Sequence, residues 1–193
     1  MRWPRHADAD RRLPKPNALH AYLLDADDDL AEEFDIRARI AARQLATVRV
    51  LEADVGECDL RPWLDAAERG PGLLILDGLI LAETQIGDRW AAELLGAGDL
   101  LQPSRQRQDD LLERTDQWRV LWLTRFGLLD ADFAERVRPF PQITHALLRR
   151  AGRRIADIDT LRAITSQPRL EVRLVLLLWH LAARWGRVGP GGI

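Results

Sequence analysis

The sequence predicts an α+β fold in which a block of short strands is followed by helices. Two observations support this fold class. Short apolar runs, each closed by Gly or Asp, recur from Gly72 to Leu101, as expected for buried strands. From Pro141 to Trp185, apolar residues instead recur at a spacing of three and four, which is typical of helices. Because the strands precede the helices in one contiguous block, the order indicates α+β rather than alternating α/β.

The composition provides enough apolar residues for a substantial core. Of the 193 residues, 47% are hydrophobic and seven are Trp, and the formal net charge of -2 gives no basic excess toward nucleic acid or membranes. Cys58 is the only cysteine, so an internal disulfide cannot form and a reducing cytoplasm is expected. No stretch reaches the ~18 uninterrupted apolar residues of a membrane span, and no signal-peptide core opens the chain. We therefore expect a cytoplasmic protein without a membrane partner.

The N-terminal part of the chain predicts a flexible arm, a helical region and a strand. Residues 1–17 are charged, contain three prolines and show no periodicity. A helical region follows over 25–44, opened by aspartates that suit a helix N-terminus and interrupted near Asp35. Residues 45–52 alternate valines with polar residues, which fits a strand. The passage after it is rich in Gly and Pro and predicts loops, with one short strand near Leu60.

Residues 72–101 form the central stretch of the predicted fold. Asp77-Gly78 is expected to make one turn and Gly87-Asp88 another. A Gly inside a strand pair, as at position 78, further predicts a bulge or a close approach of two backbones. The turns are expected to separate three short strands, Leu73–Leu76, Leu79–Ala82 and Trp90–Leu95.

A polar connection and a further strand follow this stretch. Residues 102–117 have no strand period, which predicts a long connection or a short helix near its end. Residues 118–123 return to alternation, with Trp118, Val120 and Trp122 on one face. This shared face predicts either core filling or the apolar lining of an effector pocket.

Two helices come next, one short and one long. Asp130 is expected to cap a short helix over 131–137, which Pro139 ends. Pro141 opens the long helix, which runs to about Thr165 with an apolar stripe on one side. Arginines are expected to occupy its other side: Arg149, Arg150, Arg153 and Arg154.

The apolar stripe of the long helix needs a partner, which is the strand block, a second copy of the chain, or both. We predict a dimer interface formed by six stripe residues: Leu147, Leu148, Ala151, Ile155, Ile158 and Leu161. After Pro168, a last helix over 170–185 is apolar on most faces and is expected to be largely buried.

These stretches resemble the Crp/Fnr family of bacterial transcription regulators, most closely its divergent actinobacterial branch. Residues 72–101 resemble the central hairpins of the family's β-roll, and Gly98-Asp99-Leu100-Leu101 resembles the turn before its effector-binding loop. Residues 141–165 resemble its long dimerisation helix. The most specific stretch, LEVRLVLLLWHLAARWGRV at 170–188, is similar to the helix that opens its winged helix-turn-helix domain. The resemblance covers about residues 19–190.

The resemblance implies an antiparallel β-roll, a jelly roll like the cyclic-nucleotide-binding domain, with an N-terminal helix and long C-terminal helices. The family's recognition helix is expected after Val188, where five residues remain. The implied layout is a flexible arm (1–17), a β-roll sensor domain with flanking helices (18–138), a long dimerisation helix (139–166) and the first helix of an incomplete winged-helix domain (168–193).

The implied function is that of a transcription regulator of Crp/Fnr type, with this chain as its effector-sensing and dimerising part. We expect a homodimer that reaches DNA only through a helix-turn-helix not present in this chain, with RNA polymerase as a family-level partner. The alternative is a stand-alone dimeric β-roll interaction module that lacks DNA binding.

The family's cyclic-nucleotide grip is expected to be missing. Members that bind cyclic nucleotides use a Gly-Glu pair for the ribose and a later Arg-Ser/Thr-Ala for the phosphate. No Gly-Glu pair follows Asp99, and Arg114-Thr115 leads into Asp116 with further acids nearby, which oppose a phosphate. We therefore expect no cofactor and no bound cyclic nucleotide. The candidate effector-binding residues are Arg105, Arg107, Trp118 and Trp122.

A metal enzyme built on a similar barrel, as in cupins, is the competing class. Such a site needs two or three histidines with a carboxylate, two of them close together on one strand. Cys58 stands between Glu57 and Asp59, which raise a thiol pKa and disfavour a nucleophile, and no Gly-rich phosphate loop is present. The four histidines lie outside the strand block: His6, His20, His145 and His180. We predict no catalytic residue and no metal ligand.

Overall fold

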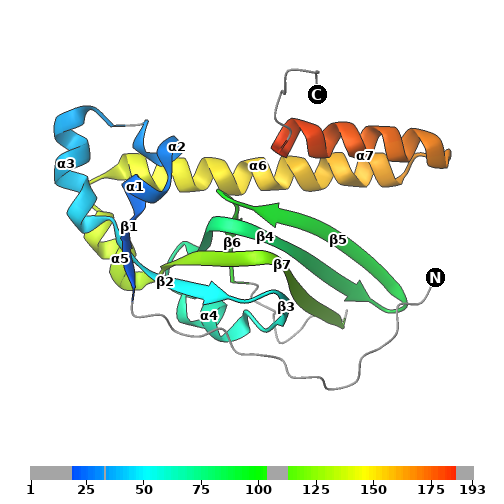
Figure 1. Ribbon diagram of the computed structural model, residues 1–193, viewed down its shortest axis with the longest axis horizontal. Coiled ribbons are helices and arrows are strands. Elements are labelled where there is room, and N and C mark those ends of the chain that lie inside the picture. Colours follow the sequence, from blue (N-terminus) through cyan, green and yellow to red (C-terminus); the bar gives the residue numbers. More distant parts are fainter. Residues whose placement is uncertain (1–18, 33, 104–112, 186–193) are drawn as a thin grey trace. The chain divides into compact units, whose positions relative to one another are not determined.

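A computed structural model describes residues 19–32, 34–103 and 113–185 of the chain (Figure 1). The chain divides into two compact units, which we call unit 1 (Met1–Ala151) and unit 2 (Gly152–Ile193). The elements are β1 (His20–Tyr22), α1 (Leu23–Ala26), α2 (Asp28–Ala31), α3 (Ile36–Leu45), β2 (Thr47–Ala53), β3 (Gly56–Cys58), α4 (Arg61–Ala66), β4 (Gly72–Ile86), β5 (Arg89–Gly96), β6 (Leu100–Leu101), β7 (Arg114–Leu129), α5 (Ala131–Val137), α6 (Pro141–Thr165) and α7 (Leu170–Trp185).

Unit 1 is built on one antiparallel sheet with the strand order β1-β2-β7-β4-β5. The short strands β3 and β6 pair with β7 and β4, respectively. The long strands β4 and β7 run antiparallel from Gly72↔Leu129 to Ile86↔Arg114 and form the curved centre of the sheet (Figure 1). This arrangement is the predicted antiparallel β-roll, followed by the long C-terminal helices.

The sheet separates two apolar clusters, one on each face. Three adjacent leucine pairs in β4, β6 and β7 contribute one residue to each cluster, because successive side chains of a strand point to opposite faces. Leu74, Leu100 and Leu129 enter the helix-side cluster, which α1, α2, α3, α5 and the start of α6 complete. Their neighbours enter the roll cluster, which α4 covers: Leu73, Leu101 and Leu128. Burial on both faces explains why these strands read as continuous apolar runs.

The predicted turn at Asp77-Gly78 is wrong, because β4 is one strand of 15 residues that passes through it. The pairing of β4 with β7 instead shifts register around this point. Gly78 has φ +108, and a Cβ there would lie 2.4 Å from Thr124 Oγ1. The predicted bulge and close backbone approach at Gly78 are therefore confirmed. The second predicted turn, Gly87-Asp88, is also confirmed as the two-residue loop between β4 and β5.

The strand β7 begins at Arg114, earlier than the predicted start at Trp118. Its first residues pair with the end of β4 where the ladder is exposed to solvent, so they carry polar side chains and lack an apolar period. The short strand predicted near Leu60 is confirmed as β3, which ends at Cys58, and Leu60 itself is the N-cap residue of α4. Pro62 fits there because the first helical turn needs no N–H donor from it.

Aspartate side chains cap α2, α3 and α5, whereas α1 and α4 begin without a side-chain cap. The helical region over 25–44 is split into three helices, and Asp35 caps the third by accepting a hydrogen bond from Ala38 N at 2.8 Å. Asp130 caps α5 by accepting from Phe133 N at 2.9 Å. The bounds of α5 and of α6, which Pro141 opens, are those that the sequence predicts.

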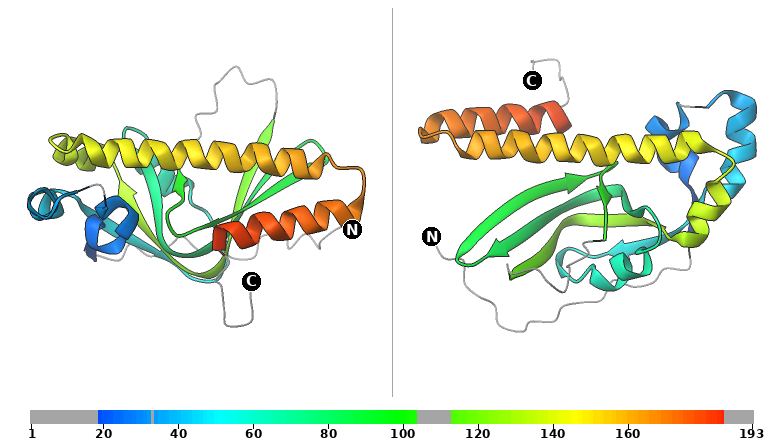
Figure 2. Two further views of the ribbon diagram at one scale, coloured as in Figure 1. Left: turned by 90° about the horizontal axis from the view of Figure 1, so that it is seen from above. Right: turned by 180° about the vertical axis from the view of Figure 1, so that it is seen from behind.

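The expectation that the last helix is largely buried is wrong. No residue of α7 is buried, and Leu178 and Trp179 are 65% and 63% exposed. The helix instead lies antiparallel to the end of α6 in a two-helix hairpin within unit 2 (Figure 2). The described helices include none that is long and apolar enough to span a membrane.

Candidate functional site

The predicted effector residues fall in different places. Arg105 and Arg107 lie in residues 104–112, outside the described part of the chain. Trp118 is half-buried against the roll cluster, whereas Trp122 is 67% exposed. The prediction that the two tryptophans lie on one face of the strand is therefore wrong. Whether any of these residues binds an effector stays a prediction.

A bulge explains why the two tryptophans separate. Ile80 pairs with Val120 and Leu79 pairs with Trp122, so Leu121 is an extra residue in β7. One extra residue inverts the alternation of side chains along a strand. Trp118 thus stays on the face of Val120, while Trp122 turns to the opposite face.

The turn between β5 and β6 is held by its own hydrogen bonds and by bonds to β4. Asp99 Oδ2 accepts from Gly96 N at 2.8 Å, and Gly98 N donates to Ile75 O at 2.8 Å. Ile75 N donates in return to the carbonyl of Asp99 at 2.9 Å. Gly98 has φ +87, a conformation that favours glycine. The Gly-Asp turn therefore anchors the chain on the sheet just before residues 104–112.

A buried arginine on α6 grips this turn from outside the sheet. The guanidinium of Arg150 binds Asp27 through two nitrogens, at 2.5 and 2.6 Å, and donates to the carbonyl of Gly98 at 3.2 Å. The side chains of Arg150 and Asp27 are only 6% and 10% exposed. We call this set of three residues the Arg150 clamp. It joins the cap of α2, the turn before residues 104–112 and the start of the long helix.

The prediction that Arg150 lies on the side of the long helix opposite its apolar stripe is wrong, because the residue is buried. The side of α6 that enters the helix-side cluster carries Ile143, Ala146 and Leu147, and Arg150 follows at the same helical spacing. This spacing was the one signal that could have identified it. Charge alone suggested solvent, because an arginine is rarely buried unless it is paired. Its partner, Asp27, is 123 residues away in the sequence, so no local pattern indicated that the two residues form an ion pair.

The electrostatics of the Arg150 clamp depend on complete pairing. A charge withdrawn from water is costly unless an opposite charge and hydrogen bonds replace its hydration. The Asp27 carboxylate also accepts from Leu30 N at 3.2 Å as the cap of α2. Moving the turn or α6 would therefore leave buried polar atoms unpaired.

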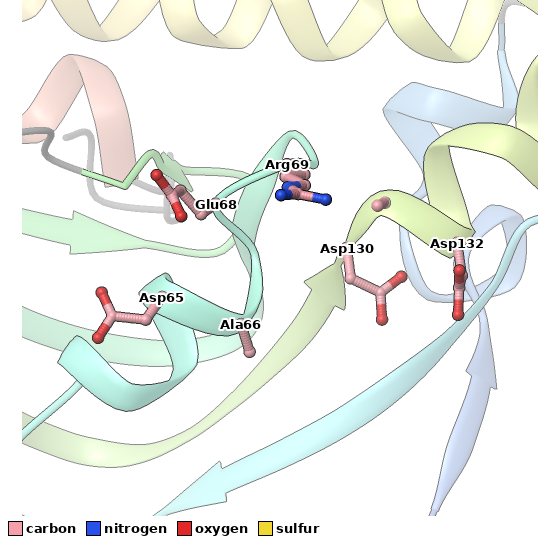
Figure 3. Close-up of a pocket in the computed structure, with 7 residues that line it drawn as sticks. Asp65, Ala66, Glu68, Arg69, Asp130 and Asp132 are labelled. Carbon is pink, nitrogen blue, oxygen red and sulfur yellow. The ribbon is translucent and has the colours of Figure 1, made fainter.

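A shallow cavity of about 290 Å³ lies between the end of α4 and the start of α5 (Figure 3). Its lining is dominated by carboxylates, which oppose an anionic ligand. They point in different directions, with Asp65 directed away from Asp130 (Figure 3). The lining residues are Asp65, Ala66, Glu68, Arg69, Asp130, Ala131 and Asp132. Among the described residues, no group of three His, Cys, Asp or Glu side chains is arranged to hold a metal ion.

The single cysteine lies inside the roll. Cys58 is 7% exposed and belongs to the roll cluster. Burial, and then the charge of Asp59, raises the pKa of the Cys58 thiol to about 12. The predicted direction of this shift is confirmed, although the sequence suggested only the contribution of the neighbouring acids.

The predicted dimer residues of α6 differ in exposure. Leu147 is buried in the helix-side cluster, and Ala151 packs against that cluster. Leu148 and Ile155 are 61% and 62% exposed and lie seven residues apart, which places them on one side of the helix. Ile158 and Leu161 are half-buried.

Comparison with known proteins identifies the fold. The sequence matches no family model and no curated protein. In structure, the chain is similar to a cyclic nucleotide-binding domain containing protein from Listeria monocytogenes, with a TM-score of 0.53 and 14% identity. The match covers 71% of this chain and 63% of that protein, so the chain spans less than two thirds of its length. The chain has the fold of a cyclic-nucleotide-binding domain.

Two further solved structures show weaker similarity. One is a CooA mutant from Carboxydothermus hydrogenoformans, with a TM-score of 0.47 and 15% identity over 79% of this chain and 95% of that one. The other is a protein from Eubacterium rectale assigned to the crp/fnr family of transcriptional regulators, with a TM-score of 0.47 and 13% identity over 82% and 73%. The fold assignment rests on the Listeria protein, and the predicted cyclic-nucleotide-binding-domain-like roll is confirmed at the level of fold.

Proposed function

We propose that this chain is the effector-sensing and dimerisation part of a transcription regulator of Crp/Fnr type. The observation that carries the proposal is the Arg150 clamp on a cyclic-nucleotide-binding-domain fold. An effector bound near residues 104–112 would move the Gly98 turn, and Arg150 would pass that displacement to α6. The clamp thus joins the sensing part of the proposal to its output helix.

In this proposal the output is the geometry of a homodimer. The exposed pair Leu148 and Ile155 on α6 supplies an apolar stripe that a second copy of the same helix would cover. DNA is contacted by a helix-turn-helix that is not part of these 193 residues, and RNA polymerase is a partner at the family level.

We propose further that the effector is not a cyclic nucleotide. The Arg114-Thr115 pair is the nearest match to a phosphate grip. However, Arg114 Nε donates to Asp116 Oδ1 at 2.9 Å, and Thr84 donates to the same oxygen at 2.7 Å. A guanidinium that is already paired with a neighbouring carboxylate is a poor phosphate ligand.

A thermal-shift screen with cyclic AMP, cyclic GMP, haem and small anions tests the sensing part. We expect no stabilisation by either cyclic nucleotide. A ligand at 100-fold excess over its Kd stabilises the folded state by about 2.7 kcal/mol. Stabilisation of that size by a cyclic nucleotide would overturn the proposal about the effector while leaving the regulator proposal intact.

Recovery of cross-linked DNA with the native protein, from the cells that make it, tests the regulator proposal. We expect enrichment of specific DNA sites, reduced by Leu148→Asp with Ile155→Asp and retained by the matched control Ala156→Asp. Ala156 is exposed on the same helix, next to Ile155. Recovery of no DNA would contradict the proposal.

One observation favours a second candidate, the stand-alone β-roll interaction module. The apolar, exposed helix α7 suits a protein contact and has no evident part in sensing an effector. Under this candidate, the native protein is recovered with a protein partner and without DNA, so the same cross-linking experiment separates the two.

A further inference from the structure

The strand β5 forms one edge of the sheet in unit 1 (Figure 1). Among the described strands, only β4 pairs with it, and this pairing runs without a register shift from Leu79↔Gly96 to Ile86↔Arg89. The first four residues of β5, Arg89 to Ala92, are exposed. The edge of a sheet carries main-chain N–H and C=O groups that can pair with a further strand. The exposed half of β5 is therefore a candidate for strand addition.

The turn before β5 decides which of its main-chain groups point outward. Gly87 and Asp88 form a two-residue loop, in which Gly87 has φ +58. In such a turn the last residue, here Arg89, directs its N–H back toward the first. Residues along an antiparallel strand then alternate between bonding to one neighbour and facing the other side. The main-chain groups of Trp90 and Ala92 therefore point away from β4.

The exposed half of β5 lacks the features that usually keep another strand away from an edge. Between Arg89 and Glu93 the strand has no proline, no lysine and no bulge. Its two charged residues have opposite signs and enclose the stretch Trp-Ala-Ala. Because side chains alternate, Arg89, Ala91 and Glu93 share one face of the sheet, and Trp90 and Ala92 share the other. This order of charges and sizes is complementary to its own reverse.

We propose that β5 pairs antiparallel with β5 of a second copy of this chain, about a two-fold axis at Ala91. This axis sets Arg89 opposite Glu93 of the partner subunit, and symmetry produces the same pair a second time. Opposite charges that face each other across two strands stabilise their pairing. The axis also sets the large Trp90 opposite the small Ala92 of the partner subunit. Each of these Trp90–Ala92 pairs can exchange two main-chain hydrogen bonds, because the groups of both residues point outward.

Other registers of the same two strands lose this complementarity. Residues that face each other across two antiparallel strands lie on the same face, so the residue opposite Arg89 can change only in steps of two. One step sets Arg89 opposite Ala91 of the partner subunit. The step in the other direction sets it opposite Leu95, which is fully buried in the roll cluster. Only the axis at Ala91 pairs the two charges.

The side chain of Arg89 is accessible to a partner. It is 91% exposed, and its Nε lies 3.9 Å from the carboxylate of Asp88, which is itself 93% exposed. Such an exposed contact contributes little, so the guanidinium can turn toward a second copy at small cost. The proposed ladder is short, which places the interface at the weak end of specific interfaces. It does not involve the α6 stripe and does not depend on the proposed function.

Reversing the two charges tests the register. The full chain with Leu148→Asp and Ile155→Asp is the background, since these substitutions prevent association through α6. We expect it to self-associate in sedimentation velocity over a concentration series. Arg89→Glu alone and Glu93→Arg alone should each weaken this association at least roughly 10-fold, because both ion pairs become like-charge pairs. Mixing the two proteins should restore it, because an acidic edge then faces a basic edge.

The matched control is Arg37→Glu, which makes the same change of charge at an exposed position of α3. It should leave the association unchanged, and far-ultraviolet circular dichroism checks that every variant is folded. A background protein that stays monomeric up to about 1 mM would overturn the proposal. A mixture of the two charge variants that associates no better than its components would also overturn it.

Disulfide trapping locates the axis independently. Ala91 would face Ala91 of the partner subunit in a pair without main-chain hydrogen bonds, where Cα atoms are about 4.5 Å apart and a disulfide can form. Ala91→Cys should therefore become linked under mild oxidation, while the native Cys58 is buried and should not react. The control Ala92→Cys is also exposed but faces Trp90 of the partner subunit, so it should remain largely unlinked. Equal linking of the two proteins would contradict an axis at Ala91.

Discussion

Arg150 is the residue whose replacement has the clearest physical consequence. Arg150→Ala leaves the Asp27 carboxylate, only 10% exposed, without its counter-charge. Removing one partner of a buried ion pair costs about 3–5 kcal/mol, so we expect a loss of roughly 3 kcal/mol in the free energy of unfolding. Urea denaturation measures it. The control Arg153→Ala, at an exposed position one turn later on α6, should change stability by less than about 0.5 kcal/mol.

The same ion pair tests whether the lost stability comes from the uncompensated charge of Asp27. Replacing both charges, as in Arg150→Met with Asp27→Leu, should restore much of the stability, since well-packed apolar residues often substitute for a buried pair. A double variant as unstable as Arg150→Ala would show that the loss has a different origin.

Gly78 is a second residue whose identity the fold requires. Its φ of +108 disfavours any side chain, and a Cβ would lie 2.6 Å from the carbonyl oxygen of Leu123. We expect Gly78→Ala to reduce the free energy of unfolding by about 3 kcal/mol, from backbone strain and overpacking together. Gly87→Asn is the control, because Gly87 also has positive φ but a Cβ there meets nothing within 4 Å. Equal losses in the two variants would contradict the close-approach explanation.

The Cys58 thiol should be nearly inert in the folded protein. With its pKa raised to about 12 from an ordinary 9.0, its thiolate fraction near pH 8 falls about a thousandfold. We expect a thiol reagent such as dithionitrobenzoate to react slowly at pH 8 and rapidly after unfolding in urea. The raised pKa also means that this group stabilises the fold fully below pH 9 and loses that contribution as the pH rises toward 12. Fast labelling of the native protein would show that the thiol is accessible.

At the scale of elements, α6 separates into a buried beginning and an exposed stripe. Ile155 is 62% exposed, whereas Ile158 is half-buried, so a charge at Ile155 tests the proposed α6 dimer interface with less effect on the fold than a charge at Ile158. Together with Leu148→Asp, it should raise the dissociation constant of an α6-mediated dimer by at least roughly 100-fold. Light scattering over a concentration series measures this change. Ala156→Asp should have no comparable effect. A wild-type protein that stays monomeric would contradict the proposed α6 dimer interface.

The strands show how far sequence patterns reach at this scale. The apolar run Leu73–Leu76 predicted a buried strand, and both faces of the sheet are indeed buried there. The pattern failed at Asp77-Gly78, where an Asp-Gly signal typical of turns lies inside β4. Pairing with β7 keeps the strand continuous and absorbs the irregularity as register shifts. A local signal cannot report a partner strand that lies nearly 50 residues away in the sequence, as Asp77 and Arg125 do.

At the scale of the whole chain, the order of elements identified the fold class before any contact was known. Apolar period and helix caps such as Asp35 and Asp130 act within a few residues, so they can be read directly. They predicted the strand block and the bounds of α5 and α6. The stretches that resemble the Crp/Fnr family implied the β-roll, and the structure confirms that fold.

The sequence alone determined the α+β class and the two-residue turn after β4, because these depend on local period and glycine chemistry, and its resemblance to a known family implied the β-roll. Only the tertiary structure decided the rest. It buried Arg150 against Asp27 and turned Trp122 away from Trp118. It also left the apolar side of α7 exposed. Each of these depends on which distant segment a side chain meets, and long-range pairing leaves no period in the sequence.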